Sequence, residues 1–139
     1  MLETLKDMMG IAEKEGIAIG GFNTPNLASL EAVIGAAEEE KLPVILMFAE
    51  CHDEWVSLDL IGPAMLNAAK QATVPVCVHL DHGEHLEYLK KALELGFTGI
   101  MYDGSVLPYE ENVANTKKAV EMAREHGASV EAELGSMGR

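Results

Sequence analysis

Three short segments of the chain carry residue types that bind metal ions or transfer protons. They are Asp81-His82-Gly83, Asp103-Gly104-Ser105 and Glu133-Leu134-Gly135. One imidazole with two or three carboxylates is a mixed nitrogen and oxygen ligand set that suits zinc or a harder divalent cation. A second interpretation treats the carboxylates as helix caps and strand-end residues that face water. Spacing alone leaves both interpretations open.

The other histidines give weaker indications of a site. His79 lies two residues before Asp81 in the same apolar run, so both side chains share one strand face. We expect His79 to be a neutral, hydrogen-bonded residue in the interior. His85, one turn into a helix, and His126, near a helix end, are expected on the surface. His52 lacks partners at ligand spacing and is expected in a loop.

The elements that must position these residues alternate regularly along the chain. Apolar runs predict strands at 17–22, 43–48, 75–80, 98–102 and 128–133. Helical patterns and start signals predict helices at 2–15, 24–40, 58–71, 84–95 and from 108 to the closing Gly127. In the second helix, Thr24 is the expected N-cap and Pro25 the first helical residue. This alternation indicates βαβ units and a parallel α/β sheet.

Each predicted strand delivers a hydrogen-bonding or ligand-capable residue at its carboxyl end. In chain order these residues are Asn23, Glu50, Asp81 with His82, Asp103, and Glu133. In an open doubly wound sheet only the strands beside the switch point meet a ligand, whereas all strands of a (β/α)₈ barrel point at one mouth. The pattern therefore favours a TIM barrel. Such a barrel needs about 250 residues, so residues 1–139 are expected to form an incomplete single domain: an N-terminal helix and the first five β/α units.

Charge and composition exclude several classes of partner. The formal net charge of −13 repels nucleic acid and anionic membranes, so neither is expected as a partner. A bound phosphate would have to be held locally, by backbone N–H groups, helix N-termini or a metal ion. We expect no signal peptide and no membrane span, and the two lone cysteines fit a reducing cytoplasm.

Three longer motifs resemble one enzyme family. PVCVHLDHG (75–83), GFTGIMYDGSVLPYEENVANT (96–116) and SVEAELGSMG (129–138) occur in the order and at the spacing typical of the class II fructose-bisphosphate and tagatose-bisphosphate aldolases. The resemblance extends from residue 16 onward and implies a TIM-barrel lyase of carbohydrate metabolism (glycolysis). Such enzymes reversibly cleave a ketose 1,6-bisphosphate into dihydroxyacetone phosphate and glyceraldehyde 3-phosphate, through an enediolate that zinc stabilises.

The resemblance also implies a role for each matching residue. Asp81 corresponds to the carboxylate that transfers the proton of the substrate C4 hydroxyl, and His82 to the first histidine ligand of the catalytic Zn²⁺. Asp103 and Glu133 correspond to carboxylates of a second metal position, for a divalent or monovalent cation, or of an alternative resting place for the zinc. Asn23 corresponds to an asparagine close to the substrate. The family further implies a sugar bisphosphate as ligand, a homodimer or homotetramer, and a cytoplasmic location.

Several features leave alternatives open. The family's other zinc histidines and its glycine-rich loop lie beyond Arg139, so we expect the 139-residue chain alone to be inactive. Arg139 stands where the family usually has a small residue. Ala49 stands where some members have a serine that touches the aldehyde fragment, so the aldehyde selectivity stays open. The family's residues that sense the C4 configuration lie largely beyond Arg139, so the choice between fructose and tagatose bisphosphate stays open as well. The alternatives are a non-catalytic half-barrel that needs a partner, and another metal-dependent sugar-phosphate barrel enzyme such as an isomerase.

Overall fold

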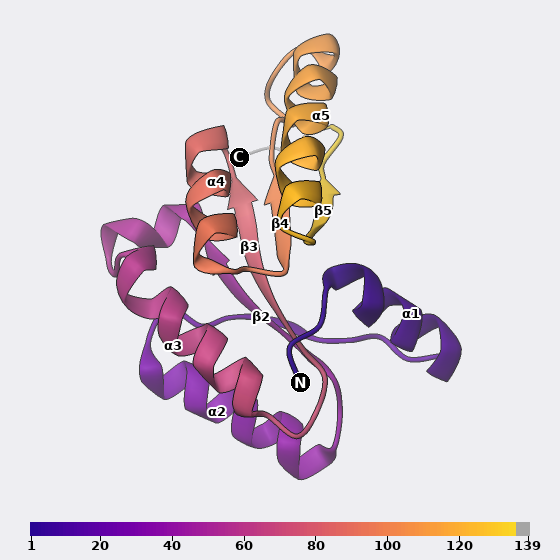
Figure 1. The fold of residues 1–139 in the computed structure, drawn as a ribbon, viewed down its shortest axis with the longest axis vertical. Coiled ribbons are helices and arrows are strands. Elements are labelled where there is room, and N and C mark those ends of the chain that lie inside the picture. The colour runs from indigo at the N-terminus through magenta and orange to yellow at the C-terminus, as the bar shows by residue number, and fades with distance from the viewer. Residues whose placement is uncertain (136–139) are drawn as a thin grey trace.

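A computed structural model describes residues 1–135, in which helices and strands alternate (Figure 1). The strands are β1 (Gly21–Asn23), β2 (Val44–Ala49), β3 (Val76–Gly83), β4 (Gly99–Tyr102) and β5 (Ser129–Ala132). The helices are α1 (Leu5–Glu15), α2 (Leu27–Glu40), α3 (Leu58–Gln71), α4 (Leu86–Leu95) and α5 (Tyr109–Glu125), with a short 3₁₀ helix, η1 (Glu50–Glu54), after β2. None of these helices has both the length and the apolar character needed to cross a membrane.

The strand order identifies the architecture. All five strands are parallel, and each pairs with its neighbour in the chain, in the order β1-β2-β3-β4-β5. A doubly wound sheet reverses its strand order at the point where the ligand binds, and no reversal occurs here among the described residues. The predicted partial (β/α)₈ barrel is therefore confirmed.

Alternation along the strands separates two faces. The outward residues of β2, β3 and β4 pack against α2 to α5 in one large apolar cluster that includes Leu46, Phe48, Val78, Leu80 and Ile100. The inward residues Ile45 and Cys77 instead contact Met8 of α1, so α1 covers the other face of the sheet. Figure 1 shows α1 set apart from the other helices in this way. The remaining inward positions are available for a site.

The start of α2 differs from its prediction. Thr24 is fully buried and is not the N-cap, because its N–H donates to the carbonyl of Met47 at 2.9 Å and prolongs the pairing of β1 with β2. Asn26 caps α2 instead, with its side-chain oxygen accepting from the N–H of Ser29 at 2.9 Å. Pro25 thus precedes the helix. The predicted strand at 17–22 is also wrong at both ends, since β1 covers only Gly21–Asn23.

The boundaries around β3 and β5 also shift. β3 continues to Gly83 instead of ending at residue 80, so Asp81 and His82 belong to the strand and do not follow it. Helix α4 begins at Leu86 and not at residue 84. Glu133 lies one residue beyond the end of β5 at Ala132. These shifts of a few residues leave the polar side chains at the carboxyl ends of their strands.

Candidate active site

An extra residue near the end of β3 determines which way His82 points. Leu80 pairs with Ile100 and Gly83 with Tyr102, so three steps along β3 match two along β4. His82 adopts a left-handed backbone conformation with φ of 43°. A regular strand would turn Asp81 and His82 to opposite faces. The bulge instead re-aims His82 toward the residues that follow β4 and β5, as bulges beside functional sites commonly do.

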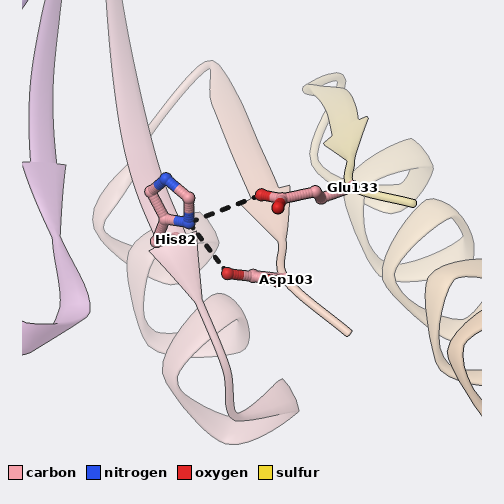
Figure 2. Close-up of side chains that lie close together, drawn as sticks. All are labelled: His82, Asp103 and Glu133. Atoms are coloured by element: carbon pink, nitrogen blue, oxygen red, sulfur yellow. Dashed lines mark hydrogen bonds and ion pairs between the residues drawn. The ribbon is translucent and has the colours of Figure 1, made fainter. Parts of the chain in front are cut away.

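His82, Asp103 and Glu133 form a cluster at the carboxyl ends of three neighbouring strands (Figure 2). Nδ1 of His82 lies 2.8 Å from Oδ2 of Asp103 and 3.8 Å from Oε2 of Glu133. One donor atom from each residue lies within 4.8 Å of the others. The Asp103 side chain is almost fully buried, whereas that of His82 is half exposed. The cluster thus opens to solvent on the His82 side.

Electrostatics favour charged groups in this cluster. Burial raises the pKa of Asp103, but hydrogen bonds from Ser105 and His82 outweigh burial and lower this pKa to about 2. The hydrogen bond to Asp103 raises the pKa of His82, against the opposing effect of burial, and the nearby carboxylates add to the rise. Asp103 therefore stays an anion at neutral pH, which is the form that binds a cation.

Asp81 lies beside this cluster and accepts a separate hydrogen bond. The side-chain amide of Asn23, at the end of β1, donates to Oδ2 of Asp81 at 3.0 Å. Asp81 is 9% exposed and borders a cleft of about 640 Å³. The cleft is also lined by Asn23, Ala49, Glu50, His82 and His85. A buried carboxylate with one oxygen fixed and access to a cleft is suited to transferring a proton to a bound molecule.

Two further polar residues hold the carboxylates in place. The hydroxyl and N–H of Ser105 donate to Oδ1 of Asp103 at 2.6 and 3.0 Å. Asn112, buried in the first turn of α5, donates from its side-chain amide to the backbone carbonyl of Glu133 at 2.8 Å. Ser105 lies in the motif that contains Asp103, but Asn112 is 21 residues from its partner, so only the fold reveals its contact.

The remaining histidines lie outside the cluster. His79 is buried, as expected, and its Nε2 lies 3.2 Å from Oε2 of Glu131, which lowers the pKa of Glu131. His85 and His126 are exposed, as expected. His85 is the N-cap residue of α4 and not part of its first turn. His52 lies in η1, where its Nδ1 accepts from the N–H of Ala49 at 3.3 Å.

The donor set fits a divalent cation. One imidazole nitrogen and two carboxylate oxygens are hard to borderline ligands of the kind that zinc accepts, and the three come within reach of one ion here. The structure therefore brings together all five predicted site residues: His82 with Asp103 and Glu133, and Asp81 with Asn23. Arg139 lies outside the described residues, and Ala49 lines the cleft beside Asp81.

Comparisons with known proteins agree with this arrangement. The "Fructose-bisphosphate aldolase class-II" family model matches residues 3–139. The chain is 46% identical to the "Probable fructose-bisphosphate aldolase" of Bacillus subtilis (strain 168) and 43% identical to a fructose-bisphosphate aldolase of Staphylococcus aureus (strain Mu50 / ATCC 700699). Both alignments cover 99% of this chain and 49% of the relative. The chain thus spans about half the length of the curated relatives it matches.

A solved structure gives the same result. The chain is similar to the YdjI aldolase from Escherichia coli K12, with a TM-score of 0.92 and 38% identity, over 99% of this chain and 54% of that one. Because the family match covers nearly every residue, this chain belongs to the class II fructose-bisphosphate aldolase family.

Proposed function

We propose that this chain provides the proton-transferring carboxylate and part of the metal site of a zinc-dependent aldolase of its relatives' full length. Its substrate is a ketose 1,6-bisphosphate, of the fructose or tagatose type, and the products are dihydroxyacetone phosphate and glyceraldehyde 3-phosphate. The observation that carries the proposal is the meeting of Asp81 with the cluster of His82, Asp103 and Glu133 at one end of a parallel sheet.

Asp81 transfers the proton of the substrate's C4 hydroxyl. Its Oδ2 accepts the amide of Asn23, so we assign the proton to Oδ1. The fixed amide orients the carboxylate toward the cleft and holds it against rotation, and positioning of this kind is a large part of general-base catalysis. In the cleavage direction Oδ1 takes the proton from the hydroxyl, and in the condensation direction it returns the proton.

His82, Asp103 and Glu133 are the residues of this chain that hold the metal ion. A bound Zn²⁺ supplies Lewis-acid polarisation of the substrate carbonyl. His82 lines the cleft, while Asp103 is buried and Glu133 is partly exposed. We propose that these two carboxylates provide a second cation position or an alternative resting place for the zinc. Ser105 and Asn112 keep them in place.

The expected setting of the enzyme follows from the same features. The net charge of the chain is −13, but a metal ion supplies positive charge at the site itself, so an anionic sugar bisphosphate is an acceptable partner while nucleic acid is not. We propose a cytoplasmic homodimer or homotetramer. Cys51 and Cys77 are both free thiols, which fits a reducing compartment.

The test is an aldol-cleavage assay of the full-length protein that contains this chain. Release of dihydroxyacetone phosphate from fructose and tagatose 1,6-bisphosphate is followed with a coupled dehydrogenase. We expect zinc-dependent cleavage, and the Asp81→Asn variant should lower kcat by about 10²–10⁴-fold, the usual contribution of a general base.

The matched control is His126→Gln. His126 is the exposed C-cap residue of α5 and precedes β5, whereas Glu133 follows the other end of that strand, so this variant should cleave at the wild-type rate. Cleavage that persists in excess chelator would rule out the metal mechanism. Isomerised sugar phosphate without cleavage would instead support the alternative of an isomerase.

A further inference from the structure

Both carboxylate oxygens of Glu50 contact the turn that follows the β3 bulge. Its Oε2 accepts the backbone N–H groups of Glu84 at 2.7 Å and of His85 at 3.2 Å. Its Oε1 lies 2.6 Å from Nδ1 of His85. The Glu50 side chain is only 17% exposed, whereas that of His85 is 74% exposed. Charge-assisted bonds of this kind are stronger than neutral ones.

The position of Glu50 in the chain makes this contact a link between two strands. Glu50 comes directly after β2, where Ala49 pairs with Asp81. The turn that it binds comes directly after Gly83, the last residue of β3. Glu50 therefore connects the carboxyl end of β2 to the first residues after the bulge, within the cleft that Asp81 and His82 also line.

The bulged segment needs such a link because its conformation is unfavourable. A non-glycine residue with φ of 43° persists only when its surroundings impose it, since the left-handed conformation costs about 1–2 kcal/mol. One restraint is the N–H of Asp103, which donates to the carbonyl of Gly83 at 2.9 Å. That bond fixes Gly83 to β4. The two bonds that Glu50 accepts fix the next two residues, Glu84 and His85, to the start of η1 directly after β2.

We propose that Glu50 is a positioning residue that keeps the turn after β3 in place and so holds His82 directed at Asp103 and Glu133. This inference rests on the proposed function for its catalytic meaning, but its structural content stands independently of any reaction. Glu50 binds the backbone N–H groups of Glu84 and His85, so its effect on the cluster runs through the backbone of residues 82–85.

The test compares Glu50→Ala and Glu50→Gln with Glu87→Gln in the full-length protein. Glu87 is an exposed acid in the first turn of α4, so its variant removes the same charge near the same turn. The first readout is taken without metal: the backbone ¹³C shifts of His82 and the hydrogen exchange of the Glu84 and His85 amides. Glu50→Ala should shift the His82 signals and speed exchange about tenfold or more, because hydrogen bonds to a charged group are lost.

The second readout is zinc affinity, which is measured by titration and compared between proteins of similar thermal stability. Glu50→Ala should weaken zinc binding about 10–100-fold, the usual effect of losing a residue that supports a ligand. Glu50→Gln should lie between alanine and wild type, since one carbonyl oxygen remains as acceptor. Glu87→Gln should bind zinc as the wild type does.

Two results would overturn the inference. One is a Glu50→Ala protein whose His82 signals match the wild type, and the other is a protein whose His82 signals move while zinc affinity is unchanged. A wild-type protein that binds no zinc would sink the proposed function instead. In that case the His82 signals of Glu50→Ala alone decide whether Glu50 holds the turn.

Discussion

His82 combines a side chain suited to metal binding with a backbone conformation that is unfavourable for histidine. Its imidazole is the nitrogen donor of the cluster, but φ of 43° is a conformation that glycine tolerates far better. The chain thus has a histidine at a position where backbone preference alone would favour glycine. Observed strain at a cluster of ligand-capable side chains is what a functional constraint predicts.

This conflict predicts opposite effects on stability and binding at position 82. His82→Gly and His82→Ala should both lose most of their zinc affinity, because each removes the imidazole. His82→Gly should nevertheless be more stable than His82→Ala by about 1 kcal/mol, since glycine relieves the left-handed strain. Urea denaturation of the two metal-free proteins checks this. Equal stability, or a more stable alanine variant, would mean that residue 82 is not left-handed.

The residue types of the site were predictable from the sequence, but their relative orientation was not. Asp81, Asp103 and Glu133 were found because the carboxyl ends of parallel strands meet at one edge. The two-residue period of a strand would have placed His82 on the face opposite Asp81. The pairing of Gly83 with Tyr102 instead directs the His82 side chain toward Asp103 and Glu133. That pairing joins residues that no local sequence pattern connects.

At the scale of elements, the irregular end of β3 determines the shape of the site. Gly83 closes the bulge in a space that admits no side chain, because a Cβ there would meet Leu89 and the backbone oxygen of Met101, the latter at 2.9 Å. Element types followed from periodicity, yet boundaries such as the start of α2 did not. Thr24 looked like a cap by residue type, but its N–H is bonded to Met47.

Gly83→Ala should therefore be strongly unfavourable. The backbone oxygen of Met101 cannot move without disturbing β4, so we expect a loss of about 1–3 kcal/mol in the free energy of unfolding, together with weaker zinc binding.

Gly35→Ala provides the comparison. Gly35 lies within α2 with nothing near its added methyl group, so this variant should gain about 0.5–1 kcal/mol. Denaturation curves for both variants decide the point. A neutral Gly83→Ala protein would show that the bulge is not closely packed.

At the scale of the whole molecule, the sheet is a consecutive series of barrel strands. The fold class followed from the alternation of strands and helices, and the sequential strand order excluded the doubly wound alternative. The chain spans about half the length of its curated relatives. Phe22 of β1 is exposed and lines an apolar groove of about 490 Å³, together with residues of α2 and of the segments 17–20 and 42–44. Sheet edges and apolar grooves of this kind are normally covered.

We therefore predict that the 139-residue chain alone does not cleave ketose bisphosphates. His82 is the only histidine of the described cluster, so a site with several histidine ligands cannot form from it alone. The coupled assay, run with zinc on the isolated chain and on the full-length protein side by side, checks this. Turnover by the isolated chain at a rate near that of the full-length protein would contradict it.

The central claim is that His82, Asp103 and Glu133 provide ligands for divalent cation binding beside Asp81. An anomalous difference map, collected at the zinc absorption edge from crystals of the zinc-loaded full-length protein, tests it most directly. We predict a peak within about 2.0–2.2 Å of the His82 imidazole or of the Asp103 and Glu133 carboxylates, next to the cleft of Asp81. A zinc ion located elsewhere in the map, with none of these three side chains as a ligand, would contradict the claim.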